Sequence, residues 1–251
     1  MKIDLNADAG ESFGNWKLGR DEELFPLLSS VNVACGFHAG DPLTMGRTLE
    51  LAQKTGLAVG AHPGFPDLVG FGRREMAATP EEIYADVLYQ VGALSAFLKV
   101  RGLALHHVKA HGALYNRATR DPETARAIAQ AVRDFDPAVP LVVLPNTPLE
   151  QEAQRLGLRT VAEAFPERGY SRDGRLAPRG TPGAWIHEPE VAARRAVQMV
   201  VEGRVAAVDG GWVEVRAQTL CIHGDNPSAV EIARAVREAL WAEGVSIETY
   251  A

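Results

Sequence analysis

Short β-type runs alternate with helical runs along the whole chain, and this alternation constrains the fold more than any other feature. Repeated βα units of this kind predict parallel strands that are connected by helices. Seven strands are predicted, at residues 2–6, 31–35, 57–61, 106–110, 140–144, 159–163 and 219–223. Seven units in 251 residues favour a closed β/α barrel over an open doubly wound sheet, although spacing alone does not decide between them.

Helix starts are marked where a capping side chain stands directly before a proline. The pattern predicts four of them, at Asp41-Pro42, Thr79-Pro80, Asp121-Pro122 and Asn226-Pro227. The second start leads into an amphipathic helix that ends near Gly102, because apolar residues recur at helical spacing after it. These helices belong to the scaffold.

Two regions break the alternation. Residues 204–216 read as two strand-like runs around an Asp-Gly-Gly turn, which predicts a β-hairpin inserted before the last strand. Residues 163–184 are rich in Gly, Pro and Arg, and their length favours a lid or binding loop over a passive linker. Because no shift in composition marks a boundary, residues 1–251 are predicted to form one domain.

The charge balance argues against nucleic acid and anionic membranes as partners. The chain has 26 Lys plus Arg against 32 Asp plus Glu, which gives a net charge of −6. No run approaches the roughly 18 apolar residues of a membrane span, and no apolar signal segment is evident, so a cytoplasmic location is expected. Cys35 and Cys221 stand in apolar runs and are predicted to be buried free thiols.

The first strand carries acidic and amide side chains on one face. The two-residue period puts Ile3 and Leu5 on one side and Asp4, Asn6 and Asp8 on the other. Carboxylates beside a core are costly unless they are paired, hydrogen-bonded or bound to a cation, so this face is predicted to look into a polar cavity. The alternative is that Asn6 and Asp8 only tie down the loop that follows.

Four histidines lie just past the predicted ends of parallel strands: His38, His62, His111 and His223. That edge is where β/α barrels build their active sites. Imidazoles and carboxylates gathered there serve either as metal ligands or as general acid and base, and no H-E-x-x-H or C-x-x-C motif decides between these roles. Acid/base catalysis is favoured. Asp41 and Asp225 stay ambiguous, because helix capping or loop ordering would also explain them.

Signatures of nucleotide binding are absent from the sequence. The chain has no G-x-x-x-x-G-K-[ST] loop and no G-x-G-x-x-G turn. If ATP takes part in the reaction, this chain is therefore not expected to hold it in a P-loop.

Five segments together resemble the LamB/YcsF family. They are DLNADAGESFG (4–14), VNVACGFHAGDP (31–42), GAHPGFPDLVGFGRR (60–74), VKAHGALYN (108–116) and CIHGDNPSA (221–229). The match runs in order over nearly the whole chain. The resemblance implies a seven-stranded barrel of the glycoside hydrolase/deacetylase type. It also implies the role of the A subunit in a prokaryotic ATP-dependent 5-oxoprolinase, which opens the lactam of 5-oxo-L-proline to L-glutamate with B and C subunits.

The chain departs from the usual family pattern at a few positions. Ala7 replaces a common cysteine, Ala110 replaces a proline, and Pro166-Glu167 stand where Ala-Asp is usual. Glu167 is longer than the usual aspartate by one methylene.

The expected site combines catalytic groups with groups that contact the substrate. Asp8, His62, His111 and Lys109 are predicted to be catalytic, with Asp8 and one histidine activating water and the other histidine protonating the leaving nitrogen. Substrate contacts are predicted at Asn6, Glu11, His38, Arg73, Arg74, Asn116, Arg168, His223 and Asp225. In the loop, Arg172, Arg175 and Arg179 either close over the substrate anion or form a solvated surface.

Cofactors and alternative functions remain open at this point. ATP is expected as a co-substrate bound by the partner subunits. A divalent metal, if present, is expected on Asp8, His38, His62 and His111. The alternatives are a metal-dependent deacetylase or amidase acting on another small amide, and a non-catalytic substrate-binding subunit.

Overall fold

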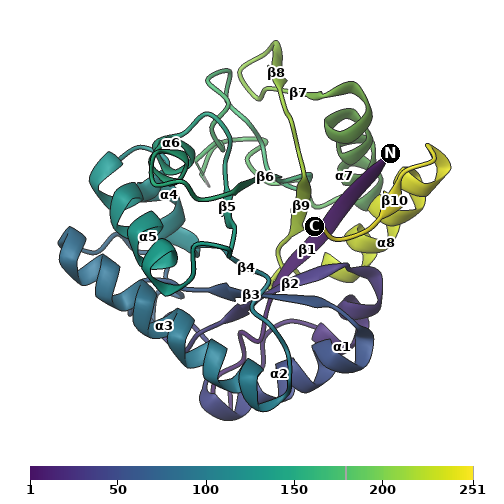
Figure 1. Cartoon of the computed structure of the whole chain (residues 1–251). Helices are drawn as coiled ribbons and strands as arrows, with labels where there is room; N and C mark the ends of the chain where they lie inside the picture. The colour runs from purple at the N-terminus through teal and green to yellow at the C-terminus, as the bar shows by residue number, and fades with distance from the viewer. Residues whose placement is uncertain (179, 251) are drawn as a thin grey trace.

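The computed structural model describes residues 1–178 and 180–250. Its centre is a ring of seven parallel strands, each hydrogen-bonded to the next and closed by pairing of the first with the last (Figure 1). The strands are β1 (Lys2–Ala9), β2 (Ser30–Ala34), β3 (Ala58–His62), β4 (His107–Val108), β5 (Leu141–Val143), β6 (Thr160–Ala164) and β9 (Thr219–Ile222). The seven predicted strands and the predicted barrel are confirmed.

Helices surround the ring (Figure 1). They are α1 (Asp21–Leu24), α2 (Pro42–Thr55), α3 (Pro80–Val100), α4 (Gly112–Ala118), α5 (Pro122–Phe135), α6 (Pro148–Arg155), α7 (Pro189–Val197) and α8 (Ala229–Ala242), with a 3₁₀ turn at Phe25–Leu27 and a π-helical turn at Gln198–Glu202. Their apolar faces pack on the outward side chains of the strands, such as Leu5, Val33 and Val108. The main hydrophobic core is therefore the layer between strands and helices.

Three of the four predicted helix starts are confirmed. Asp41 and Asp121 accept hydrogen bonds from backbone N–H groups of the first turn, and Thr79 forms a capping box with Glu82. The fourth is wrong, because α8 begins at Ala229, two residues after Pro227. The side chain of Asn226 instead accepts from Ser228 N, and its Nδ2 is committed to another contact described below.

Helix α3 is long and apolar enough, by length and composition alone, to cross a membrane. In the fold it lies on the outside of the barrel and packs against α5, with Val87, Val91 and Leu94 buried (Figure 1). This arrangement is that of a barrel helix whose inner face covers the strands.

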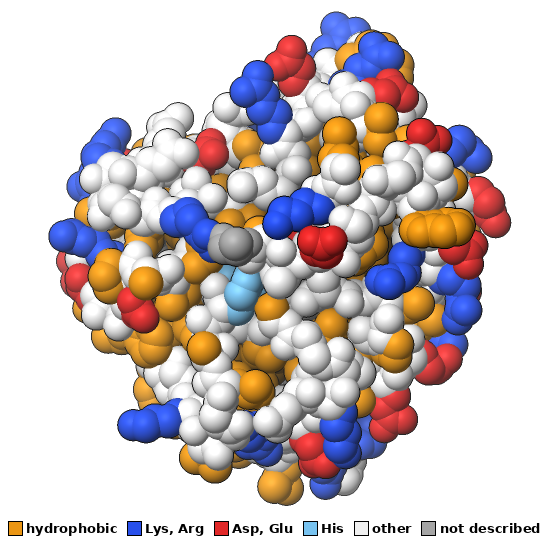
Figure 2. Space-filling view, turned by 45° about the vertical axis from the view of Figure 1, so that its right-hand side comes forward, with side chains coloured by type: hydrophobic (Ala, Val, Ile, Leu, Met, Phe, Trp, Pro, Cys, Tyr) orange, Lys and Arg blue, Asp and Glu red, His pale blue; other side chains and the backbone are white. Residues whose placement is uncertain are grey.

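The predicted hairpin is confirmed as β7 (Arg204–Ala206) paired antiparallel with β8 (Trp212–Glu214). A further short strand, β10 (Ser246–Ile247), pairs with the start of β1 and brings the two ends of the described chain together. On the face shown in Figure 2, basic and acidic side chains are interspersed, so this face carries no large field of one sign.

Polar side chains fill the inside of the barrel. The usual filling of such a barrel is branched and apolar, whereas here Asp4, Asn6 and Asp8 of β1 point inward, as predicted, and are buried. Asp4 accepts from Ser30 Oγ and Thr219 Oγ1, and Asn6 Nδ2 donates to Thr219 Oγ1. Burial raises the pKa of Asp4, and these hydroxyl contacts oppose the shift.

A second set of contacts crosses the barrel above Asp4. Asn32 of β2 donates from Nδ2 to Asn6 Oδ1 at 2.7 Å and to Asp8 Oδ1 at 2.8 Å, and its own Oδ1 lies 2.7 Å from His107 Nε2. His107 fits because Gly60 has no side chain: a Cβ there would lie 2.2 Å from the ring of His107. The space at Gly60 is thus filled by the ring of His107 from the neighbouring strand β4. We call Asp4, Asn6, Asn32, His107 and Thr219 the lower layer.

Candidate functional site

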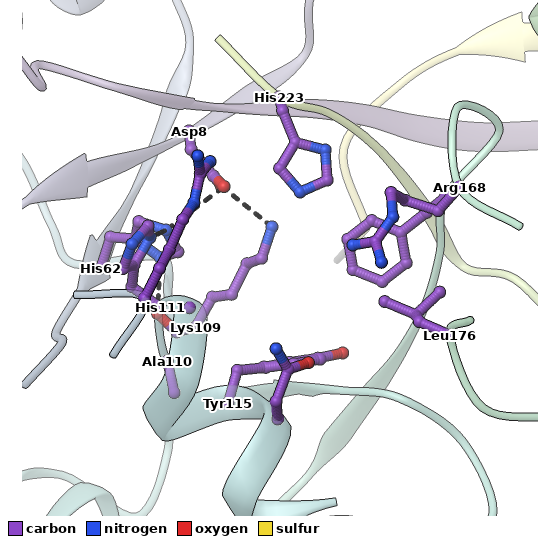
Figure 3. Close-up of a pocket in the computed structure, with 13 residues that line it drawn as sticks. Asp8, His62, Lys109, Ala110, His111, Tyr115, Arg168, Leu176 and His223 are labelled. Atoms are coloured by element: carbon purple, nitrogen blue, oxygen red, sulfur yellow. Dashed lines mark hydrogen bonds and ion pairs between the residues drawn. The ribbon is translucent and has the colours of Figure 1, made fainter. Parts of the chain in front are cut away.

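A cleft opens at the C-terminal ends of the strands, directly above the lower layer. Figure 3 shows side chains from several strands and loops converging on it. Of the predicted site residues, those that line the cleft are Asp8, His62, Arg73, Lys109, His111, Asn116, Arg168 and His223. The 163–184 loop contributes Phe165, Arg168 and Leu176 to the same lining, so it forms part of the cleft wall.

Lys109 is the buried cation at the floor of the cleft. Its Nζ lies 2.9 Å from Asp8 Oδ1 (Figure 3). It also lies 2.8 Å from Glu163 Oε1 and 3.0 Å from Cys221 Sγ. Burial lowers the pKa of Lys109, but Asp8, Cys221 and Glu163 together outweigh this effect, and the pKa lies well above its usual value. An ammonium group has three donors, and all three point to these partners. Lys109 therefore positions Asp8 and has no donor left for a substrate.

Asp8 is ionised as a result of this environment. Burial raises the pKa of Asp8, but the opposing effects of His62 and Lys109 together are larger, and the pKa lies well below its usual value. Its Oδ2 lies 3.3 Å from His62 Nε2, and its Oδ1 is held by Lys109 and Asn32. The carboxylate is thus fixed from the lower layer and from the side, with one oxygen directed toward the histidines.

Two histidines have their tautomers fixed by backbone carbonyls. His62 Nδ1 lies 2.8 Å from the carbonyl oxygen of Lys109, and His111 Nε2 lies 2.8 Å from that of Phe71. Because a carbonyl only accepts, each of these nitrogens carries the proton of the neutral ring. The remaining nitrogens, His62 Nε2 and His111 Nδ1, face each other at 3.0 Å. In the neutral rings this places two lone pairs against each other.

The carbonyl that orients His111 lies in a strained turn. Phe71 has a φ of 55°, in the left-handed region that side chains other than glycine rarely adopt. Gly72 follows with a φ of 61°, and a Cβ there would lie 2.7 Å from both His38 and His111. The strained conformation of Phe71 therefore places its carbonyl oxygen against the ring of His111.

Glu11 and His38 complete a cluster with these two histidines. One ligand atom from each of Glu11, His38, His62 and His111 lies within 4.8 Å of the other three, and all four residues are buried. Glu11 Oε1 and both ring nitrogens of His38 make no hydrogen bond to any described residue. Burial lowers the pKa of His38 and of His111 well below the usual value, and burial together with Asp8 raises that of Glu11. We call these four residues the upper cluster.

The carboxylate of the upper cluster is not the predicted one. The metal-ligand set expected from sequence contained Asp8, whereas the structure gathers Glu11 with the three histidines and ties Asp8 to Lys109. Glu11 was expected to contact substrate, but it lies behind the histidines and does not line the cleft.

His223 stands across the cleft from His62 (Figure 3). Its Nδ1 is hydrogen-bonded to Glu167 Oε1, and its backbone N–H donates to the same oxygen at 2.8 Å. Asn226 Nδ2 holds the other Glu167 oxygen at 2.9 Å. Glu167, the residue that departs from the family pattern, is fully buried and orients the imidazole of His223. The other ring nitrogen of His223 remains available to the cleft, which His223 lines.

Two arginines form the outer wall of the cleft. Arg73 pairs with Asp225 at 2.6 Å through Nη2, while its buried Nε has no partner among the described residues. Arg168 is 4% exposed and is fixed by the carbonyls of Ala184 and Ala177. Asp225 therefore orients Arg73 and does not itself line the cleft. Both guanidinium groups are suited to binding a carboxylate or phosphate.

Some predicted residues are not brought to the cleft. Arg74 is mostly exposed and pairs with Asp67, so its expected substrate contact is not supported. Asn6 belongs to the lower layer. Arg172 donates to the Gly210 carbonyl, and Arg175 pairs with Asp173 near the surface. Arg179 lies outside the described residues.

Comparison with known proteins identifies the family of the chain. The model of the LamB/YcsF family matches residues 3–251. The chain belongs to the LamB/YcsF family. Two curated relatives of this LamB/YcsF protein are each named as the A subunit of 5-oxoprolinase. The one from Thermus thermophilus is 67% identical over 250 residues, covering 100% of both chains. The one from Symbiobacterium thermophilum is 55% identical over 246 residues, covering 98% of this chain and 94% of the other.

Solved structures agree with the fold. The lactam utilization protein from Thermus thermophilus superposes with a TM-score of 0.96 at 66% identity and full coverage of both chains. A T48 deacetylase is similar at a TM-score of 0.48 and 14% identity over 99% of this chain and 87% of its own, a level at which the likeness carries no argument.

Two buried carboxylates beside the cleft were not predicted. Glu163 is an acidic residue inside an apolar strand. The two-residue alternation that predicted the inward position of Asp8 would also have placed Glu163 inward, beside Lys109. Glu167 lies in the irregular loop, where only the folded contacts with His223 and Asn226 show its role.

Proposed function

We propose that this chain is the lactam-opening A subunit of an ATP-dependent 5-oxoprolinase, which acts on 5-oxo-L-proline together with B and C subunits. Two curated relatives bear that name at 67% and 55% identity, each over nearly the whole chain. The observation that carries the proposal is the cleft itself. Arginines at its outer wall face a buried carboxylate and a carboxylate-oriented imidazole at its floor.

Each group of the substrate has a counterpart in this cleft. The carboxylate of 5-oxoproline pairs with Arg73 and Arg168, which both line the cleft. Asp8, ionised and fixed by Lys109, orients the water that attacks the lactam carbon. The proton that this water loses passes to the free ring nitrogen of His223, whose Nδ1 is held by Glu167, and the resulting imidazolium protonates the departing ring nitrogen. In this assignment His223 takes the acid/base role expected of His62 and His111, because the lone pairs of those two rings face each other inside the upper cluster.

ATP supplies the activation that a stable lactam needs. Amide resonance disfavours attack, and ring opening expels a poor amine leaving group. We infer that the partner subunits bind ATP and phosphorylate the lactam oxygen, and that this cleft completes the opening. An ATP-coupled reaction of this kind also favours the cytoplasmic location expected from the sequence.

Reconstitution tests the proposal. The three subunits together should form glutamate and release phosphate in a 5-oxoproline-dependent manner, and omission of this chain should abolish glutamate formation. A reconstituted variant with His187→Ala, which changes an exposed histidine, serves as the control and should retain wild-type rates. Glutamate formation at the full rate without this chain would exclude the proposal.

A further inference from the structure

We infer that the upper cluster binds one divalent transition-metal ion through Glu11, His38, His62 and His111. Three observations on the described residues support a cation at this place: the paired lone pairs, the unpartnered atoms, and the spacing of the donor atoms. The inference deepens the proposed function, since the cluster borders the cleft, but binding of the ion itself does not depend on which substrate the cleft takes.

The first observation is the contact between His62 and His111. Carbonyl oxygens fix the protons of both rings on their outer nitrogens, so the inner nitrogens are 3.0 Å apart with both lone pairs facing inward. Such a contact is repulsive unless a proton or a metal ion lies between or beside the two atoms. A single proton shared by the two rings would relieve this pair alone.

The second observation decides in favour of an ion over a proton. Glu11 Oε1 and His38 Nε2 lie 3.4 Å apart without a hydrogen bond, and both atoms are unpartnered in a fully buried position. Leaving such buried polar atoms without a partner is destabilising. One cation beside the four donor atoms would satisfy all of them at once, which a proton between His62 and His111 does not do.

The third observation is the spacing of the donors. Tetrahedral bonds of about 2.0–2.1 Å place neighbouring ligand atoms roughly 3.3 Å apart. The corresponding separations here are 3.0 Å for His62 Nε2 to His111 Nδ1, 3.4 Å for His38 Nε2 to Glu11 Oε1 and 3.9 Å for His111 Nδ1 to Glu11 Oε1. These three separations lie within about 0.6 Å of the tetrahedral value, and all four donor atoms lie within 4.8 Å of one another.

The ligand set indicates the class of metal. Three imidazoles and one carboxylate suit Zn²⁺, Co²⁺ or Mn²⁺ better than Mg²⁺ or Ca²⁺, which prefer sites made of oxygen atoms. The outer nitrogens of His62 and His111 donate to carbonyls, as the second shell of metal-bound histidines usually does.

Zinc binding by the full chain tests this inference without any substrate. After treatment with a chelator, the chain should take up one Zn²⁺ per molecule, measured by elemental analysis and by calorimetric titration. Co²⁺ loaded in its place should give a visible d–d absorption band. Glu11→Gln and His38→Gln should each weaken Zn²⁺ binding roughly tenfold or more and alter the Co²⁺ band, while circular dichroism shows that each variant is folded.

The controls separate the ligand set from its surroundings. His187→Ala should bind Zn²⁺ within about twofold of the wild type, because this exposed ring lies outside the cluster. Asp8→Asn distinguishes the carboxylate found here from the one expected by sequence. Loss of the ion in Asp8→Asn but not in Glu11→Gln would overturn the assignment of Glu11, and absence of stoichiometric Zn²⁺ and Co²⁺ binding in the wild type would overturn the site. A wild-type chain that binds neither metal yet supports glutamate formation would refute the inference and leave the proposed function standing.

Discussion

The lower layer and the upper cluster both consist of buried polar side chains. The lower layer lies on β1, β2, β4 and β9, whereas the upper cluster has one residue on β3 and three that follow β1, β2 and β4. In the lower layer, Asp4, Asn6 and Asn32 exchange hydrogen bonds with one another or with neighbouring hydroxyl and imidazole groups. In the upper cluster, Glu11 and His38 keep atoms without partners. The difference teaches that burial alone does not mark a site. A satisfied polar network stabilises the barrel. We interpret the unsatisfied polar atoms at the carboxyl ends of the strands as a ligand site.

The largest effect is expected where a cleft residue touches the substrate. His223→Ala removes the proposed proton donor, so the rate of glutamate formation in the reconstituted complex should fall by about 10² to 10⁴-fold. The free energy of unfolding should change far less, which separates function from stability. A rate within a few fold of the wild type would show that His223 transfers no proton.

Removal of Lys109, which holds two buried carboxylates, should be the most costly change for stability. Lys109→Met leaves Asp8 and Glu163 buried without their cation, so the free energy of unfolding should fall by about 3–5 kcal/mol in denaturant titrations. The matched control is Lys54→Met, since Lys54 pairs with Glu50 on the exposed face of α2 and its loss should cost less than about 1 kcal/mol. Equal losses in the two variants would contradict the role given to Lys109.

A single pair of variants compares the two regions directly. Asn32→Ala leaves Asn6, Asp8 and His107 without a shared partner and should lower the free energy of unfolding by about 2–4 kcal/mol. Glu11→Gln in the metal-free chain should change it by less than about 1 kcal/mol, because Glu11 Oε1 has no hydrogen bond to lose. The comparison fails if Glu11→Gln is the more destabilising of the two.

The smallest effect concerns an acidic residue that the sequence left ambiguous. Asp41 caps α2, and backbone N–H groups of Gly14 and Thr44 lower its pKa to about 2. Asp41→Ala should lower the free energy of unfolding by about 1 kcal/mol at pH 7.

The pH dependence of that cap has a defined sign. Because the pKa is lower in the folded than in the unfolded chain, the stabilisation is fully present above about pH 4 and is lost as the pH falls toward 2. The stability difference between wild type and Asp41→Ala should therefore shrink over that window. A difference that is constant from pH 7 to pH 2 would exclude the ionised cap.

The sequence predicted the features that depend on local periodicity. Alternation along β1 placed Asp4 and Asp8 inward, and the ends of the strands located His62, His111 and His223. Periodicity does not determine which of two neighbouring side chains turns toward a cavity, so Arg73 and Arg74 were both predicted although only Arg73 lines the cleft.

The remaining features depend on contacts between distant segments. Glu11, and not Asp8, belongs to the upper cluster. The turn after β1 brings Glu11 to the histidines, and Lys109, which follows β4, pairs with Asp8. Glu167 lies in a loop whose path is set by contacts with the segment after β9. Such placements follow from tertiary packing, which spacing in a sequence does not encode.

X-ray absorption at the zinc edge of the Zn²⁺-loaded chain tests most directly whether the unsatisfied histidines and Glu11 form a ligand site. We expect scattering from three imidazoles and at least one oxygen at bond lengths of about 2.0–2.2 Å. A spectrum dominated by sulfur, or by water oxygens without imidazole, would show that Zn²⁺ binds elsewhere and that the upper cluster is not its site.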